Sequence, residues 1–314
     1  MRAAAVIAGV TALALSLGVS LSAGAPATGD AVPRLSLAAL AEAEPPSSIP
    51  TQREIWNRPA EPFHVIGNVY YVGTRGLSSW LIDTSKGLIL IDGALPESAP
   101  QIEQHIVALG FKLKDVKILL NSHAHFDHSG GLAQLKRDTG AILIASAGDK
   151  VSLETGTYLG SEDVHAFDAP PVKVDRVVAD GGTVTLGTTV LTAHLTPGHT
   201  RGCTTYTLSV IEYAVGHGVI FFCSASVAAN RLAPKEQYPG IVADYRSTFY
   251  TAENMGADVF LAPHQEFFHL WEKRARMAAG APNPFVDPNE LQTFIAAAKA
   301  AFEKELARQQ GKPS

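Results

Sequence analysis

The most constraining feature of this sequence is a cluster of metal-ligand residue types within six consecutive positions. The segment reads His-Ala-His-Phe-Asp-His and follows the apolar run 117–120. Imidazole and carboxylate groups are ligands that zinc accepts in proteins. In an extended turn, His123 and His125 point to the same side and can reach one metal ion. Asp127 and His128 fall beyond the bend, ahead of a helix expected to begin at residue 129 or 130, and can reach a second ion.

Two further histidines lie where they could complete such a site. His199 follows a Pro-Gly turn after the strand-like segment 190–195, and His264 follows the apolar segment 259–261. Side chains that follow separate strands meet at one edge of an α/β sheet. The sequence therefore predicts a metal centre at a sheet edge, built from three separate parts of the chain.

The chain contains 11 histidines, and those outside this set lack the same placement. One lies on the strand leading to His199 and another lies in a turn-rich loop, so a supporting role for these two stays open. For all six of these histidines we expect surface positions or ordinary hydrogen bonds, with the alternative role open only for His194 and His165; the six are His64, His105, His165, His194, His217 and His269.

Short β-rich segments alternate with helical patterns in two series. The predicted strands are 65–72, 79–82, 88–91, 116–120 and 142–144, followed by 183–186, 190–195, 204–208, 219–222 and 259–261. The predicted helices are 97–109, 131–137, 245–255 and 289–308. This alternation predicts an α/β fold with sheets between layers of helices. Because no Pro/Gly/Ser-rich linker interrupts residues 51–314, we expect a single domain there.

The first residues have the pattern of an export signal. Arg2 precedes the apolar run 3–21, and small residues follow it. Secretory signal peptides have this order, so we expect residues 1–25 to be a signal peptide and the mature protein to be periplasmic, without a stable membrane anchor. An uncleaved membrane anchor is the alternative, because the run is nearly long enough to span a bilayer. Residues 26–50 are rich in Ala, Pro and Ser and are predicted to form a flexible lead-in.

Composition excludes several classes of protein. A formal net charge of −5 is unsuited to nucleic-acid binding through phosphate neutralisation. A hydrophobic share of 46% indicates a folded chain. Two cysteines, Cys203 and Cys223, are too few for a cysteine-rich scaffold. In an oxidising compartment they could form a disulfide, and two buried thiols on neighbouring strands are the alternative.

Together, the motif of residues 123–128, the Pro-Gly-His turn and the Pro-His strand end resemble the metallo-β-lactamase superfamily. The segment Leu-Ile-Leu-Ile-Asp-Gly, residues 88–93, also resembles the strand that leads to a buried Asp in that family. The resemblance extends over about residues 67–284. It implies an αβ/βα sandwich of two mixed β-sheets flanked by helices, with two Zn²⁺ ions per chain at the sheet edge.

The resemblance also implies how the ligands divide between the ions. The first ion would be bound by His123, His125 and His199, and the second by Asp127, His128 and His264. A water or hydroxide would lie between the two ions and attack the substrate. The carboxylate at the second ion, that of Asp127, would orient this nucleophile and is a candidate catalytic group.

One strand end discriminates among the hydrolases of this superfamily. Thioesterases of the glyoxalase II type and lactonases carry a bridging Asp in a segment such as F-x-G-D. The corresponding residues here, 219–226, end in Cys-Ser-Ala-Ser without an acid. A Ser at this position, together with His128, resembles the third subclass of class B β-lactamases. Cys223 is expected to face away from the metal, because successive strand residues face opposite sides.

The implied activity is hydrolysis of the β-lactam amide bond, which confers resistance to β-lactam antibiotics. Ser224 and Ser226 could hydrogen-bond the substrate carboxylate, and Asn230 could donate to the oxyanion as a catalytic and substrate-binding residue. Ordinary loop hydrogen bonding is the alternative for all three. Asp92 and Thr200 are expected to position ligand histidines, since carboxylates and hydroxyls commonly hold such ligands.

Two other functions stay open at this point. The first is another dizinc hydrolase that cleaves a lactone, an ester or a thioester. The second is a zinc-stabilised binding protein without turnover, which six ligands disfavour because a structural zinc site closes with four. We expect a monomer that acts on a small-molecule substrate, with the loops 156–167 and 227–240 facing it.

Overall fold

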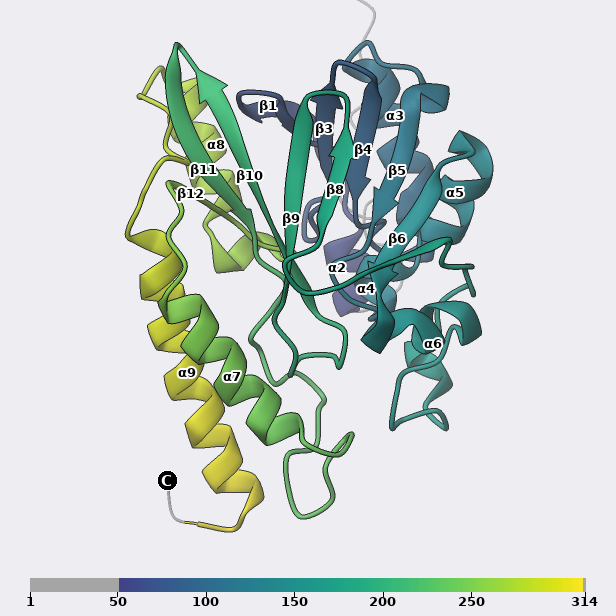
Figure 1. Ribbon diagram of the computed structural model, residues 1–314, viewed down its shortest axis with the longest axis vertical. Coiled ribbons are helices and arrows are strands. Elements are labelled where there is room, and N and C mark those ends of the chain that lie inside the picture. Colours follow the sequence, from purple (N-terminus) through teal and green to yellow (C-terminus); the bar gives the residue numbers. More distant parts are fainter. Residues whose placement is uncertain (1–50, 313–314) are drawn as a thin grey trace, which may run out of the picture. The chain divides into compact units, whose positions relative to one another are not determined.

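Figure 1 shows the computed structural model, which describes residues 51–312. The expected signal peptide and lead-in lie outside the described residues. The described residues form one compact unit. Among the described residues, no helix combines the length and apolar character needed to cross a membrane.

The first half of the chain forms a seven-stranded sheet with the order β1-β2-β3-β4-β5-β6-β7. Neighbouring strands are antiparallel from β1 to β4 and parallel from β4 to β7. The strands are β1 (Phe63–Ile66), β2 (Val69–Tyr71), β3 (Trp80–Thr84), β4 (Gly87–Ile91), β5 (Val116–Leu120), β6 (Ile142–Ser146) and β7 (Arg176–Val178). Parallel neighbours need crossover connections. These contain the helices α3 (Ala99–Ala108), α4 (Phe126–Ser129), α5 (Leu132–Thr139) and α6 (Ala147–Thr155).

The second half forms a five-stranded sheet with the order β12-β11-β10-β9-β8. Only the pair β11 and β12 is parallel, and helix α7 (Ile241–Glu253) lies in the connection between them. The strands are β8 (Thr183–Leu186), β9 (Thr189–Leu195), β10 (Thr204–Glu212), β11 (Val215–Phe221) and β12 (Val259–Leu261). The remaining helices are α2 (Gln52–Trp56) at the start of the described chain, and α8 (Leu270–Ala278) and α9 (Glu290–Gln309) near its end.

Strand β4 shows how the sequence pattern produces the layers. Its alternate residues Ile89 and Ile91 belong to the apolar core that also contains the second sheet. Leu88 and Leu90 belong to a separate core, which contains Ile102 of α3. Both faces of this strand are therefore buried, which explains its continuous apolar sequence. In Figure 1 the helices α3 and α5 flank the first sheet, and α7 and α9 lie together beside the second. This arrangement confirms the predicted sandwich of two mixed sheets flanked by helices.

Some element boundaries differ from the predictions. The segment 65–72 forms two strands, because Gly67 adopts a φ of 55° and turns the chain between β1 and β2. A Cβ atom at this glycine would lie 2.7 Å from Val210, so the packing also requires glycine. The helix after the histidine motif begins at Phe126 rather than at residue 129 or 130, which places Asp127 and His128 inside α4. The helices α6 and α8 were not predicted.

Cys203 and Cys223 form a disulfide, which decides between the two alternatives that the sequence left open. Their Cα atoms lie 5.8 Å apart, and both residues are fully buried. The antiparallel pairing of Tyr206 with Phe221 brings the start of β10 next to the chain that leaves β11. The bond therefore ties together two segments that lead to the sheet edge.

Replacing both cysteines with alanine should lower the free energy of unfolding by about 3 kcal/mol. The bond closes a loop with a sequence separation of 20, and removing this constraint increases the entropy of the unfolded chain. Urea unfolding of the double variant Cys203→Ala/Cys223→Ala measures the difference. A thiol reductant present during unfolding should produce a similar shift in the unaltered protein and none in the variant. Equal midpoints for the two proteins would contradict the prediction.

Candidate metal centre

The predicted ligands lie beyond the carboxyl ends of three strands. His123 and His125 follow β5, His199 follows β9, and His264 follows β12. The short helix α4, which follows His125, contains the other two predicted ligands, the adjacent residues Asp127 and His128. The structure thus brings all six side chains to the same region of the fold.

Main-chain hydrogen bonds between distant segments hold these strand ends together. The N–H of Ser78 donates to the carbonyl of Pro263 at 2.8 Å, and Pro263 directly precedes the candidate ligand His264. The N–H of Thr204, at the start of β10, donates to the carbonyl of Ser122 at 2.8 Å. The second bond attaches the histidine motif of the first sheet to the second sheet.

Asp127, His128 and His264 place three ligand atoms in a compact triangle. Nε2 of His128 lies 3.1 Å from Nε2 of His264 and 3.2 Å from Oδ2 of Asp127. Nε2 of His264 lies 3.4 Å from the same oxygen. Two ligands of a tetrahedral zinc ion, each about 2.0–2.1 Å from the metal, are about 3.3 Å apart. The spacing and the donor types therefore fit one zinc ion.

The other three histidines form a second group of potential ligands. One ring nitrogen from each of His123, His125 and His199 lies within 4.8 Å of the others. The three rings are buried, and their centroids are 4.5–4.9 Å apart. Nε2 of His123 has no hydrogen-bond partner within the described chain. A buried nitrogen without a partner costs free energy, which coordination of a metal ion would recover. This group also fits a zinc ion.

Asp92 fixes the orientation of His123 through an intermediate serine. The carboxylate accepts hydrogen bonds from the N–H of Ser122 at 2.7 Å, from its hydroxyl at 2.6 Å and from the amide of Asn121 at 3.0 Å. The Ser122 hydroxyl oxygen lies 3.0 Å from Nδ1 of His123. Because this hydroxyl donates to Asp92, it accepts from Nδ1–H, which leaves the lone pair of Nε2 for a metal. Asp92 thus acts on the ligand indirectly.

His199 is oriented from the opposite side of the site. Its Nδ1 lies 2.7 Å from the carbonyl oxygen of Ser226, which can only accept, so Nδ1 carries the proton and Nε2 is free to bind a metal. The hydroxyl of Tyr245 donates to the same carbonyl at 2.7 Å. The amide of Asn230 donates to the carbonyl of His199 at 2.8 Å. Both the ring and the main chain of this ligand are therefore held by specific bonds.

A second buried carboxylate, that of Asp149, joins two ligand loops. It accepts hydrogen bonds from the N–H of Ala124 at 2.9 Å, the hydroxyl of Thr200 at 2.8 Å and the N–H of Gly202 at 2.8 Å. Ala124 lies between two ligand histidines, and Thr200 follows a third. The contact requires close main-chain approach, since a Cβ atom at Gly202 would lie 2.3 Å from the N atom of Asp149. Thr200 thus acts together with an acid that sequence reasoning missed.

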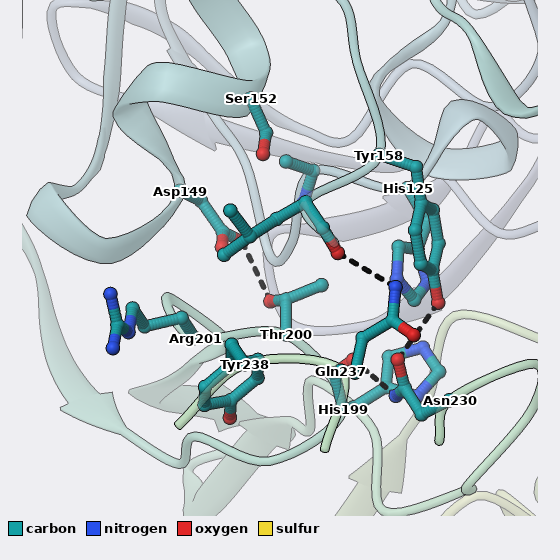
Figure 2. Close-up of a pocket in the computed structure, with 12 residues that line it drawn as sticks. His125, Asp149, Ser152, Tyr158, His199, Thr200, Arg201, Asn230, Gln237 and Tyr238 are labelled. Carbon is teal, nitrogen blue, oxygen red and sulfur yellow. Dashed lines mark hydrogen bonds between the residues drawn. The ribbon is translucent and has the colours of Figure 1, made fainter. Parts of the chain in front are cut away.

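Figure 2 shows the contact between Asp149 and Thr200 beside a small cavity, which His125 and His199 help to line. The cavity has a volume of about 20 Å³, and His125, Asp149, Thr200 and Asn230 line it. The dashed lines in the figure join Thr200 to Asp149, and they also link Tyr158, Asn230 and the carbonyl of the neighbouring ligand histidine. Two parts of the site are therefore supported by buried polar side chains rather than by apolar packing alone.

The candidate substrate cleft has a volume of about 330 Å³ and opens over the metal-binding residues. Its aromatic walls include Trp56, Phe126, Tyr158, Phe167 and Phe267. The Tyr158 ring stacks on that of a ligand histidine, with ring centroids 4.5 Å apart and an interplanar angle of 16°. These rings have no individual signal in the sequence, although two of them lie in the loop 156–167, which was expected to face the substrate.

Of the expected substrate contacts, the structure places one in the cleft. Ser226 lines the cleft. Ser224 is 2% exposed, and its hydroxyl oxygen accepts a hydrogen bond from the N–H of Ser226 at 3.3 Å. The prediction that Asn230 donates to the oxyanion requires correction. Its amide donates to the carbonyl of His199 and to the hydroxyl of Tyr245, so both N–H groups are already engaged.

Burial and neighbouring charges set the protonation of the ligands. Burial, followed by the neighbouring imidazoles, lowers the pKa of His123 and of His125. Burial likewise lowers the pKa of His199 to about 4. For Asp127, burial alone would raise the pKa, but His128 and a second imidazole outweigh it and hold the pKa well below its usual range. Around neutral pH, the first three histidines are neutral and Asp127 is ionised, which are the forms that bind a metal.

Comparison with known proteins agrees with this geometry. The sequence profile of the metallo-beta-lactamase superfamily matches residues 72–264. The structure of BJP-1, a subclass B3 metallo-beta-lactamase of Bradyrhizobium japonicum, is 49% identical with a TM-score of 0.81, and the match covers 83% of this chain and 99% of that one. The FEZ-1 metallo-beta-lactamase of Legionella gormanii is 39% identical with a TM-score of 0.79, covering 81% and 98%.

Curated relatives have a wider range of names. A hydroxyacylglutathione hydrolase of Rhodospirillum rubrum is 26% identical over 226 residues, which are 68% of this chain and 81% of that relative. Several other curated relatives are matched over only 41–62% of their own length. The profile match over more than half of the chain, together with the likeness to whole solved structures, shows that the chain belongs to the metallo-beta-lactamase superfamily and is one of its hydrolases.

Proposed function

We propose that this protein is an exported, zinc-dependent β-lactamase of subclass B3, which hydrolyses the amide bond of β-lactam antibiotics and so confers resistance to them. The observation that carries the proposal is the 49% identity to a subclass B3 metallo-beta-lactamase over 83% of this chain. The two ligand groups described above support it. The neutral end of strand β11 also supports it, since no acidic residue stands at positions 219–226.

Two zinc ions bound by the six ligands would supply an ionised water at neutral pH and polarise the lactam carbonyl. Side chains of this chain would orient the attacking water, bind the substrate and exclude bulk water. Asp127, held as a carboxylate at the floor of the cleft, would accept a hydrogen bond from the attacking water and orient it. The hydroxyl of Ser226 would donate to the substrate carboxylate. The aromatic walls would exclude bulk water from the reacting groups.

The supporting residues have proposed roles as well. Asp92 and Asp149 would preserve the geometry of the first ligand group, because each accepts a hydrogen bond from an N–H adjacent to a ligand histidine. Asn230 would position His199 rather than contact the substrate. Outer groups that orient metal ligands commonly change metal affinity when they are removed.

Export to the periplasm is part of the proposal. It is supported by the charged and then apolar sequence of residues 1–25 and by the disulfide, because disulfides persist in oxidising compartments. Resistance of the host cell then follows if the enzyme meets the antibiotic before the drug reaches its target.

Zinc-loaded protein should hydrolyse a penicillin, a cephalosporin and a carbapenem, as measured by the loss of β-lactam absorbance. A chelator should abolish this activity, and added zinc should restore it. The same preparation should be tested with a glutathione thioester and an acyl-homoserine lactone, because one curated relative is a hydroxyacylglutathione hydrolase. Rapid thioester or lactone cleavage without β-lactam turnover would overturn the proposed function.

Asp127→Asn should lower kcat for a β-lactam by about 100-fold or more, because the neutral amide no longer orients the attacking water as a carboxylate does. Far-UV circular dichroism and zinc content should be measured in parallel to separate lost orientation from lost metal. Asp115→Asn is a suitable control, since this aspartate is exposed and lies before β5, at the opposite end of that strand from the histidine motif. Full activity in the Asp127 variant would contradict the orienting role.

Asp149→Ala should weaken zinc binding by about 10–100-fold, because two ligand loops lose their common acceptor. Competition with a chromophoric chelator measures the dissociation constant. Thr200→Val removes only one of the three donors to this carboxylate and should have a smaller effect. If both residues act through the same contact, the double variant should be no weaker than Asp149→Ala. Unchanged zinc affinity in Asp149→Ala would show that the contact does not hold the ligands.

A further inference from the structure

A second cavity adjoins the substrate cleft. This apolar groove has a volume of about 470 Å³ and lies between the loop 225–228 and helix α9. Phe267, from the turn after β12, contributes to its wall. On α9, the lining includes Phe294, Ala298 and Ala301, which recur at helical spacing and therefore lie on one face. The small side chains of the two alanines leave the space that forms the groove.

The groove and the cleft share part of their lining. Ser226, Ala228 and Phe267 line both cavities. Ala228 has a φ of 49°, an uncommon conformation for a residue with a Cβ, so the loop makes a tight turn where the two cavities meet. If the hydroxyl of Ser226 binds one end of a molecule in the cleft, that end would therefore lie next to the groove.

The chemistry of the groove favours an uncharged apolar group. Its lining consists mainly of Ala, Val and Phe side chains, and Glu305 is the one charged residue among them. The carboxylate of Glu305 accepts hydrogen bonds from Arg308 and Gln309, which lower its pKa to about 2. The carboxylate of Glu305 would repel an anionic group, whereas an aromatic or aliphatic group would pack against the apolar walls.

We propose that the groove is a substrate subsite, which takes an apolar substituent from the side of the β-lactam that carries the carboxylate. This inference rests on the proposed function and on the proposed anchoring of that carboxylate by Ser226. A substituent on the adjacent ring carbon would leave the cleft past Ala228 and enter the groove. The subsite would make the enzyme favour substrates with a bulky apolar group at this position.

The test uses two cephalosporins with the same acylamino side chain. They differ only at the ring carbon next to the one bearing the carboxylate, with a methyl group in one and a phenylvinyl group in the other. Ala301→Trp fills the groove, and Ala300→Trp is the matched control, because Ala300 is an exposed neighbour on the same helix that does not line the groove. Should Ala301→Trp not fold, Ala297→Leu and its control Ala296→Leu replace the pair.

Ala301→Trp should raise KM for the phenylvinyl substrate about tenfold, the order of effect expected when an apolar group loses its pocket. KM for the methyl substrate should stay within about twofold, and the control should match the unaltered protein on both substrates. Turnover with unchanged or equally changed KM values would overturn the subsite. A shift of the variant to a different size on gel filtration would overturn it in favour of a second copy of the chain in the groove. No turnover of either substrate by the unaltered protein would instead refute the proposed function, and the subsite with it.

Discussion

The structure depends on holding five imidazoles and one carboxylate within ligand distance of one another in a buried region. This arrangement is unfavourable without a cation, since Nε2 of His128 and Nε2 of His264 lie 3.1 Å apart. In addition, Nε2 of His123 and Nδ1 of His128 have no hydrogen-bond partner within residues 51–312. The fold supplies the constraint through strand ends that carry the ligands and through main-chain bonds between segments far apart in the sequence. The close spacing of these donor atoms suits them to share a metal ion, because hydrogen bonds such as that from Nδ1 of His199 to the carbonyl of Ser226 fix the rings that carry them.

Two buried carboxylates serve the histidine motif in the same manner. Asp92 accepts from the N–H of Ser122 and Asp149 from the N–H of Ala124, so the two acids contact the main chain on either side of His123. Burial raises the pKa of each acid, and the three hydrogen bonds that each carboxylate accepts oppose this rise. The main chain of the histidine motif is therefore held by two acids from different elements. Asp92 follows β4, and Asp149 lies in the first turn of α6.

The α/β architecture and the grouping of the candidate ligands at one sheet edge could be predicted from the sequence because both depend on local patterns, whereas the sandwich of two mixed sheets was implied by the family resemblance. Apolar runs with alternating burial identify strands, and a ligand directly after such a run is placed at a sheet edge. The role of Asn230 was not predictable in this way. Its contacts with Tyr158 and His199 join residues 72 and 31 positions away, and they depend on how the loops pack. Asp149 was missed for the same reason, because its donors come from two distant turns. The disulfide stayed open until the pairing of β10 with β11 placed the two cysteines together.

The end of strand β11 links the metal centre to the choice of substrate. An acid at this position would add negative charge to a cleft whose floor already contains the Asp127 carboxylate. The chain has hydroxyl groups there instead, and Ser226 both accepts a hydrogen bond from His199 through its carbonyl and lines the cleft. A substrate carboxylate bound by the Ser226 hydroxyl would thus contact the same residue that holds the ring of His199. If Ser226 holds the substrate as proposed, a change that moves this serine would alter substrate binding and the orientation of His199 together. A change in the proposed subsite along α9 would alter substrate binding alone.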